Sequence, residues 1–241
     1  MASPTIPIPA RRHQAVASSF HFGLMLAIQV PVVAWGYYLQ HRAGSGASVL
    51  PQDLNVAPLY VSVLVLEWGL LALVRRGVNA RGIKVWELAG VHRIKAKDVL
   101  RDVAIGISFL VVAEWAARIL NSLMGPYAAK SIQSILPRST PEVVLWIAIS
   151  VSAGICEEIV YRGYFQKQFA AYTNSVAAAV VLQGVVFGVA HAYQGLHQVI
   201  IIAMLGMLYG CLAAWRKNLR ANMIAHAASD IWSGWLIKVL R

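Results

Sequence analysis

The amino-acid sequence predicts an all-α protein, a polytopic bundle of about seven transmembrane helices, within a range of about six to eight. Hydrophobic residues make up 59% of the 241 residues, charged residues only 13%, and the mean hydropathy is +0.61. A water-soluble globule of this length needs more polar surface than that. Apolar runs that are long enough to cross a bilayer recur along the chain, and Lys and Arg cluster between them.

The individual helices follow from the length of these runs. A helix rises about 1.5 Å per residue and the hydrocarbon core is about 30 Å thick, so a spanning helix needs about 20 mostly apolar residues. Glu67 in the second run and Glu114 with Arg118 in the third make those two assignments weaker. The expected spans are 20–39, 57–74, 99–120, 141–161, 175–192, 197–215 and 221–240.

The basic residues predict how these spans are oriented. Lys and Arg gather on the cytoplasmic side of membrane proteins. With the amino terminus inside, the inner segments hold Arg11, Arg12, Arg75, Arg76, Arg81, Lys84, Arg93, Lys95, Lys97, Arg101, Arg162, Lys167, Arg216, Lys217 and Arg220, and the outer ones hold Arg42, Lys130, Arg138, Lys238 and Arg241. We therefore expect a multi-pass protein of the cell membrane with a cytoplasmic amino terminus and an external carboxyl terminus.

Charge and cysteine content exclude other classes. The net charge of +11 is spread over clusters between apolar runs, which is typical of membrane orientation and not of nucleic-acid binding. Cys156 and Cys211 both lie inside apolar stretches, so we expect neither a disulfide framework nor a cysteine-ligated metal.

We expect the chain to divide into three parts. Residues 1–19 form a cytoplasmic tail, residues 20–140 contain three helices with a basic cytoplasmic loop at 75–98, and residues 141–241 form a four-helix core. We expect the loop to lie on anionic lipid as a surface helix or loop. In the core, Gly184 with Gly188 and Gly206 with Gly210 place small residues on one face of two helices, which favours close packing.

Ionisable residues concentrate in this core, and the first cluster is Glu157, Glu158 and Arg162. Such groups are costly in hydrocarbon unless they are paired or face water, so they are candidates for function. Glu158 and Arg162 are four residues apart and can form an intrahelical ion pair, whereas Glu157 points about 100° away. We interpret the pair as structural and Glu157 as free to act as a base. The alternative is that both acids only neutralise nearby basic groups.

Two further polar clusters lie on the helices that follow. Phe187 and His191 are four residues apart, so the phenyl ring can pack beside the imidazole and keep water from it. His226 and Asp230 have the same spacing, and Asn222 extends their face by one turn. A lone histidine on an apolar helix is usually a core residue, but a polar stripe of this kind does not face lipid.

These segments resemble a known family. The sequences EEIVYR at 157–162, FGVAH at 187–191 and HAASD at 226–230 match, in order and type, the EExxxR, FxxxH and HxxxN/D motifs of the CPBP family. That family comprises CAAX prenyl proteases and bacteriocin-processing, Abi-like membrane enzymes. The resemblance covers about residues 141–240 and implies an intramembrane endopeptidase whose catalytic core is the last four helices.

The resemblance also implies roles for individual residues. Glu157 corresponds to the base that activates water and His191 to its partner. His226 and Asp230 correspond to the groups that stabilise the oxyanion. Glu158 and Arg162 form the supporting pair, with Phe187 and Asn222 as further supporting residues.

Asp230 leaves the question of a metal open. The family position is Asn or Asp, and a carboxylate cannot donate a hydrogen bond unless it is protonated. It would instead orient His226, or join Glu157, His191 and His226 as a ligand of zinc. The HExxH spacing of common zinc peptidases is absent from the sequence, so we expect no required cofactor, with zinc as the alternative.

The sequence therefore predicts an intramembrane peptidase that cleaves a membrane-associated peptide or protein, prenylated CAAX-type substrates included. Its partners are that substrate and the lipid bilayer, and not nucleic acid. Non-enzymatic alternatives are a membrane scaffold, a bacteriocin self-immunity protein or a transporter that uses the same buried polar groups. Glu114 and Arg118 are four residues apart, so we expect them to pair within one helix, with contact to the substrate path as the alternative. The sequence does not assign the oligomeric state or a functional role to Glu67, Glu114 or Arg118.

Overall fold

A computed structural model describes residues 13–42, 55–90, 95–125 and 135–239. These residues are helical apart from short connections, and no strand occurs among them, which confirms the all-α class. Each of the seven expected spans coincides with a helix. The helices are α1 Ser19–Arg42, α2 Ala57–Asn79, α3 Val85–Leu88, α4 Ala96–Met124, α6 Thr140–Glu157, the π-helix η1 Glu158–Phe165, α7 Gln166–Thr173, α8 Val176–Ala190, the 3-10 helix η2 Ala192–Gln194, α9 Leu196–Arg216 and α10 Arg220–Val239.

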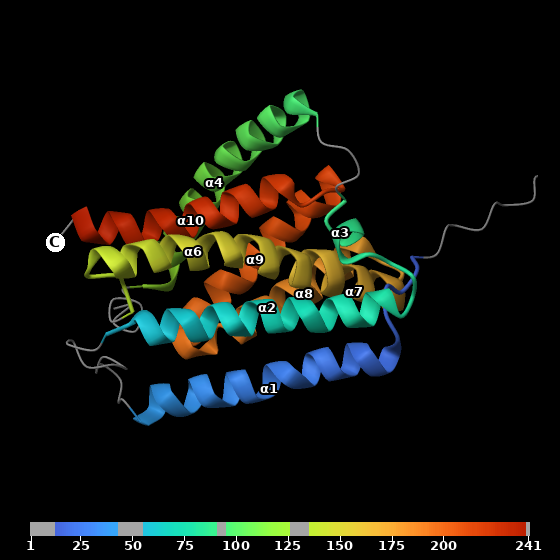
Figure 1. The fold of residues 1–241 in the computed structure, drawn as a ribbon, viewed down its shortest axis with the longest axis horizontal. Coiled ribbons are helices and arrows are strands. Elements are labelled where there is room, and N and C mark those ends of the chain that lie inside the picture. The colour runs from blue at the N-terminus through green and yellow to red at the C-terminus, as the bar shows by residue number, and fades with distance from the viewer. Residues whose placement is uncertain (1–12, 43–54, 91–94, 126–134, 240–241) are drawn as a thin grey trace, which may run out of the picture.

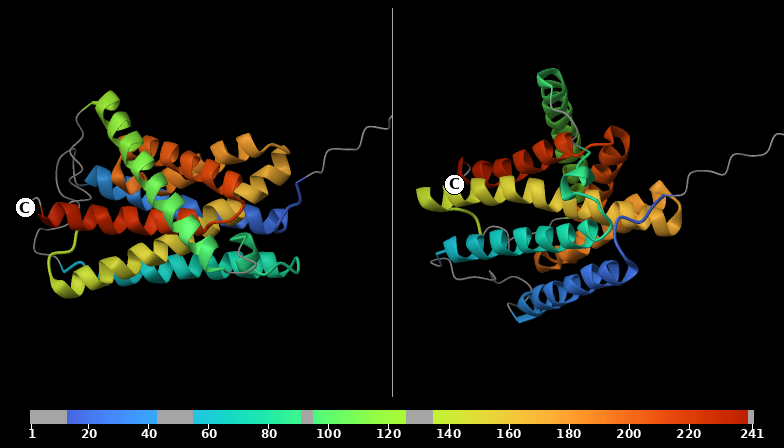
Figure 2. Two further views of the ribbon diagram at one scale, coloured as in Figure 1. Left: turned by 90° about the horizontal axis from the view of Figure 1, so that it is seen from above. Right: turned by 45° about the vertical axis from the view of Figure 1, so that its right-hand side comes forward.

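Most of these helices run roughly along the long axis of the bundle, whereas α4 crosses it obliquely (Figures 1 and 2). Four helical stretches are long and apolar enough to cross a membrane: α2, α4, the continuous helix Thr140–Thr173, and α9. The apolar stretches Ser19–Pro31 and Val176–Ala190 are shorter. Large apolar side chains such as Leu100, Leu123 and Leu196 are more than two-thirds exposed, as lipid-facing residues are. The chain is a multi-pass membrane protein.

The helix that begins the core starts at a well-defined cap. The Ser139 hydroxyl accepts a hydrogen bond from the backbone N–H of Glu142, and the Glu142 carboxylate accepts one from the backbone N–H of Ser139. This reciprocal capping box satisfies two amides that a helix start leaves unpaired. Glu142 also accepts from the N–H of Arg138 at 2.7 Å, so the start of α6 is fixed.

The sequence predicted that this helix ends at residue 161, but it continues to Thr173 through the π-helical segment η1. The N–H of Gln166 bonds to the carbonyl of Tyr161, the five-residue step of a π-helix. All eight residues of η1 are buried. Asn174 then adopts a left-handed conformation (φ 51°) and the Ser175 hydroxyl caps α8, so the chain reverses at the expected turn.

Close packing of α8 on α9 follows the predicted glycines. A Cβ atom added to Gly184 would lie 2.9 Å from the carbonyl oxygen of Ala203, and one added to Gly206 would lie 3.1 Å from Cα of Gly184. The two helices therefore meet backbone to backbone, which confirms the packing interpretation.

Helices α3 and α4, which precede the core, are attached to it by polar contacts. Asp102 of α4 is fully buried and accepts hydrogen bonds from Arg216 and Arg220, each at 2.5 Å, across the turn between α9 and α10. In the basic loop, Leu88 of α3 is buried and its carbonyl accepts from the ammonium group of Lys167 at 2.9 Å. The described part of this loop thus packs on the core as well as presenting basic residues.

We expect Gly188→Ala to destabilise the bundle, because its Cβ would lie 2.5 Å from the Val199 carbonyl oxygen and 2.6 Å from Cβ of Ala203. Overpacking of this kind lowers the free energy of unfolding by about 1–3 kcal/mol. Thermal unfolding in detergent measures the effect. Gly69→Ala is the matched control, since a Cβ there meets nothing within 4 Å. Equal melting temperatures for the two variants would contradict the α8–α9 contact.

Candidate active site

The residues that the three motifs single out come from three elements of the core. Helix α6 ends at Glu157 and η1 begins at Glu158, so the two acids lie where α-helical geometry changes to π-helical geometry. The described structure brings most of the predicted residues into direct contact with one another. They are Glu157, Glu158 and Arg162 of the α6–η1 helix, Phe187 and His191 at the end of α8, and Asn222, His226 and Asp230 of α10.

Glu158 is the most heavily bonded of them. One oxygen, Oε1, accepts hydrogen bonds from Nη1 of Arg162 at 2.9 Å and from Nδ1 of His226 at 2.8 Å. The other, Oε2, accepts from Nδ2 of Asn222 at 3.2 Å. Neither Glu158 nor Arg162 has any side-chain exposure, so the expected ion pair is present and is completely buried.

The guanidinium group of Arg162 is enclosed on its other sides as well. It lies 4.3 Å from the centre of the Phe187 ring and 5.2 Å from that of Tyr209, distances at which cation–π attraction operates. Its Nη2 donates to the carbonyl of Gly206 at 3.4 Å. Because a buried ion pair gains little net stability over apolar packing, this pair acts mainly by fixing the positions of α10 and η1.

Glu157, in contrast, has no strong partner. Its side chain is 23% exposed, and its Oε2 lies 3.7 Å from Nε2 of His226. This oxygen is buried yet forms no hydrogen bond with any described residue. Leaving a buried acceptor unpaired lowers the stability of the fold by about 1–3 kcal/mol. A donor from an incoming molecule would remove this cost, so the oxygen is available to bind one. The interpretation of Glu158 as support and Glu157 as a free carboxylate agrees with this difference.

The hydrogen bond to Glu158 fixes the orientation of His226. Since a carboxylate only accepts, Nδ1 of His226 is the donor, and Nε2 points the other way. There it lies 3.7 Å from Glu157 Oε2 and 3.6 Å from Asp230 Oδ2. Both distances are longer than a direct hydrogen bond and suit a contact bridged by a water molecule or by a substrate atom.

His191 is oriented by its own helix. Its Nδ1 donates to the carbonyl of Phe187 at 2.8 Å, so in the neutral ring Nε2 carries the lone pair. The Phe187 ring packs edge-on against His191 at 4.7 Å and against His226 at 6.1 Å. One phenyl ring therefore positions both imidazoles.

Two aromatic residues that enclose this site were not predicted from the sequence. Tyr209 of α9 packs on His226 with ring centres 5.7 Å apart, and its carbonyl accepts from Asn222 at 2.8 Å. Tyr161 packs on Phe187 at 4.8 Å. Aromatic residues are frequent in apolar helices, so nothing in the sequence marked these two.

The expected pairing of Glu114 with Arg118 is wrong. Glu114 accepts a hydrogen bond from the hydroxyl of Ser229 in α10 at 3.1 Å, and no ion pair joins it to Arg118 among the described residues. The i, i+4 spacing allows a pair but does not require one, and here the carboxyl faces the neighbouring helix.

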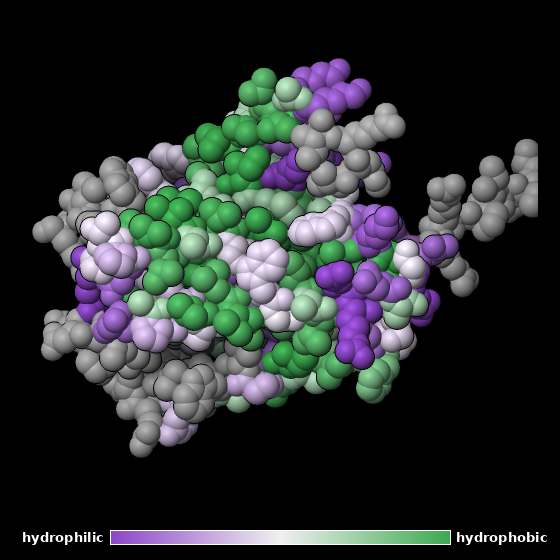
Figure 3. All heavy atoms as spheres, in the orientation of Figure 1, coloured by the Kyte–Doolittle hydropathy of each residue, from purple (hydrophilic) through white to green (hydrophobic). Residues whose placement is uncertain are grey.

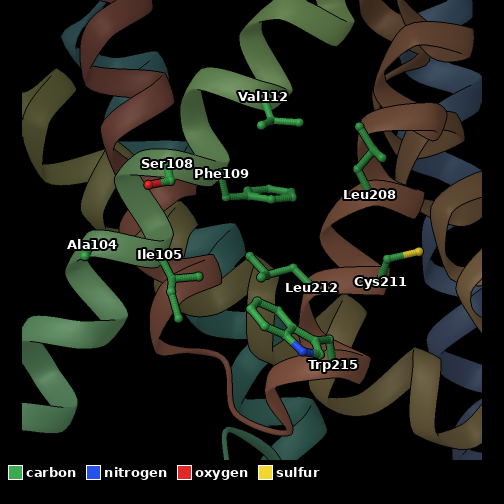
Figure 4. A pocket seen from close by; sticks show the side chains of 9 residues that line it. All are labelled: Ala104, Ile105, Ser108, Phe109, Val112, Leu208, Cys211, Leu212 and Trp215. Atoms are coloured by element: carbon green, nitrogen blue, oxygen red, sulfur yellow. The ribbon is translucent and has the colours of Figure 1, made fainter.

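An apolar groove of about 540 Å³ lies between α4 and α9 (Figure 4). Its Phe109 packs on Tyr209 at 4.8 Å, and Tyr209 separates the groove from His226. The thiol of Cys211 is the one ionisable group in its lining, and none of the residues of the three motifs lies there. The lining consists of Ala104, Ile105, Ser108, Phe109, Val112, Leu208, Cys211, Leu212 and Trp215.

Among residues 13–42, 55–90, 95–125 and 135–239, no three His, Cys, Asp or Glu side chains are grouped as ligands of a single metal ion. His226 faces Glu157 and Asp230 through Nε2 alone, because its Nδ1 is bonded to Glu158.

Comparison with protein families gives one match. Residues 139–232 match the family model described as type II CAAX prenyl endopeptidase Rce1-like. No curated protein and no solved structure matches the chain. The matched segment begins at the cap of α6 and includes all three motifs, which confirms the resemblance seen in the sequence.

We expect Glu158→Gln to lower stability strongly, since it leaves the buried Arg162 guanidinium without its counter-charge. Removing one partner of a buried pair costs about 3–5 kcal/mol. Thermal unfolding in detergent measures this loss. The double variant Glu158→Gln/Arg162→Met should recover part of it, because the unpaired guanidinium charge is also removed. A double variant less stable than the sum of the two single changes would contradict the pairing.

Proposed function

Because residues 139–232 belong to the Rce1-like type II CAAX prenyl endopeptidase family, we propose that this protein is an intramembrane endopeptidase in which Glu157 activates a water molecule. The observation that carries the proposal is the difference between the two adjacent acids. Glu158 is saturated by three donors, whereas Glu157 is partly exposed with an unpaired oxygen beside an imidazole. A general base must be free to accept a proton, and Glu157 is.

The proposed reaction is the addition of water to a peptide carbonyl. Glu157 takes one proton from water, and the second O–H of the water donates a hydrogen bond to Nε2 of His191. The water oxygen then attacks the carbonyl carbon. The C–N bond then breaks as the proton held by Glu157 passes to the leaving nitrogen. The products are a carboxylic acid and an amine, the proton of the acid then passes to the amine or to water, and Glu157 returns to its starting state.

His226 and Asp230 are assigned to the tetrahedral intermediate. With Nδ1–H bonded to Glu158, a proton on Nε2 makes His226 an imidazolium whose charge the Glu158 carboxylate balances. Its Nε2–H then donates to the oxyanion, and a donor of this kind contributes about 3–4 kcal/mol to transition-state stabilisation. Asp230, 3.6 Å from the same nitrogen, orients the ring.

We also propose that substrates are membrane-anchored peptides or proteins presented from the cytosolic side, prenylated chains included. Basic residues at the ends of α2 and α9 and the start of α10 lie at one end of the bundle, where hydrophilic residues gather in Figure 3. The positive-inside rule places that end in the cytoplasm. The amino terminus is then inside and the carboxyl terminus outside.

Glu157→Gln should abolish cleavage while the protein still folds, since the amide keeps the shape of the side chain but accepts no proton. The purified protein in detergent is assayed against lipidated and leader-type peptides by mass spectrometry. We expect at least a 10²–10⁴-fold loss of kcat, on the order typical of a general base. Glu87→Gln, a change at an exposed residue of α3, is the matched control. Cleavage retained in Glu157→Gln, or none by folded wild type, would overturn the proposal.

We propose that the reaction needs no metal ion, with zinc held by Glu157, His191, His226 and Asp230 as the alternative. Cleavage should therefore persist after prolonged dialysis against a chelator. The experiment measures the rate together with zinc content by elemental analysis. A rate that falls with zinc content and returns when zinc is added would establish the alternative.

A further inference from the structure

Glu67 lies outside the matched family segment, on α2, yet its carboxyl interacts electrostatically with Glu157, His226 and Asp230. It is 6% exposed, and its Oε2 is buried without a hydrogen-bond partner among the described residues. The side chain of Ser152, on α6, neighbours its carboxyl. Its charged neighbours are Glu157, His226 and Asp230.

The other groups that face Glu67 complete its surroundings. The thiol of Cys156 on α6 and the hydroxyl of Tyr193 on η2 both interact electrostatically with it. Tyr193 also interacts electrostatically with Glu157 and Asp230. Tyr193 itself is 40% exposed. Among the groups named here, His226 is the one that can carry a positive charge, and Glu158 already binds it.

A peptide offers two kinds of polar group to this region. The acyl side of the scissile bond presents a carbonyl oxygen, which only accepts hydrogen bonds, whereas the nitrogen side presents N–H donors that an unpaired carboxyl oxygen can accept. Hydrolysis turns that nitrogen into an amine, which takes up a proton in water and becomes a cation. A buried carboxyl with one unpaired oxygen can accept a hydrogen bond from this cationic amine, and its carboxylate form can balance the charge.

We propose that Glu67 forms the subsite that binds the leaving nitrogen, first as a peptide N–H and then as the ammonium group of the released fragment. This inference rests on the proposed function and extends it to a helix that the family match does not include. Glu67 accepts the hydrogen bond through Oε2, and Ser152 orients the carboxyl from the side of α6.

Product inhibition tests this subsite directly. The probes are the synthetic peptide that corresponds to the released carboxyl-terminal fragment and its N-acetyl form, which lacks the cationic amine. Wild type should bind the free amine about tenfold or more tightly than the acetylated form, as a charge-assisted hydrogen bond predicts. In Glu67→Gln this ratio should fall to near one, because the amide is uncharged, while Glu87→Gln keeps the wild-type ratio.

The outcomes separate this inference from the proposed function. If wild type cleaves, Glu157→Gln does not, and Glu67→Gln retains the wild-type inhibition ratio, then the subsite is refuted and the peptidase stands. If Glu157→Gln still cleaves, the proposed function itself fails. Should Glu67→Gln not fold, Glu67→Asp withdraws the same carboxyl by one methylene and should also lower the ratio. A wild-type ratio in a folded Glu67→Asp would likewise refute the subsite.

Discussion

The buried carboxylate of Glu158 is the constraint on which the rest of the site depends. A charge with no exposure to solvent persists only if its oxygens are bonded, and here three donors from two helices bond them. Arg162 comes from the same helix, and Asn222 and His226 come from α10. The hydrogen bonds to Glu158 thus hold α10 against η1, and they turn Nε2 of His226 toward Glu157. Glu158, which we assign to structural support, thus helps set the surroundings of Glu157, the proposed base.

This arrangement is built on the π-helical segment η1, whose eight residues are all buried while α6 and α7 continue the same helix on either side. Arg162 bonds Glu158, four residues earlier, and its guanidinium contacts the rings of both Phe187 and Tyr209. A π-helical segment at this point is consistent with the tendency of such segments to occur at functional sites.

The sequence predicted those features that depend on composition and spacing. Apolar runs predicted seven spans, and a helix lies at each of them; glycines spaced by four marked the contact between α8 and α9. The pair Glu158–Arg162 followed from its i, i+4 spacing. The same rule failed for Glu114, because spacing cannot say whether a side chain finds a better partner on a neighbouring helix. Nor could it reveal η1 or the aromatic enclosure, since these arise from packing between residues far apart in the chain.

Residues before the matched segment are more than a membrane anchor for it. Asp102 bonds both arginines that flank the turn into α10, so α4 helps set where the helix carrying His226 begins. On the opposite side, Gln29 of α1 accepts from the hydroxyl of Tyr161, whose ring packs against Phe187. The amide nitrogen of Gln29 is buried and unpaired among the described residues, as is Oε2 of Glu67. Unsatisfied polar atoms are costly in a lipid-exposed protein, where water cannot easily replace a missing partner. Contacts from α4 and α1 therefore reach the elements that carry the three motifs.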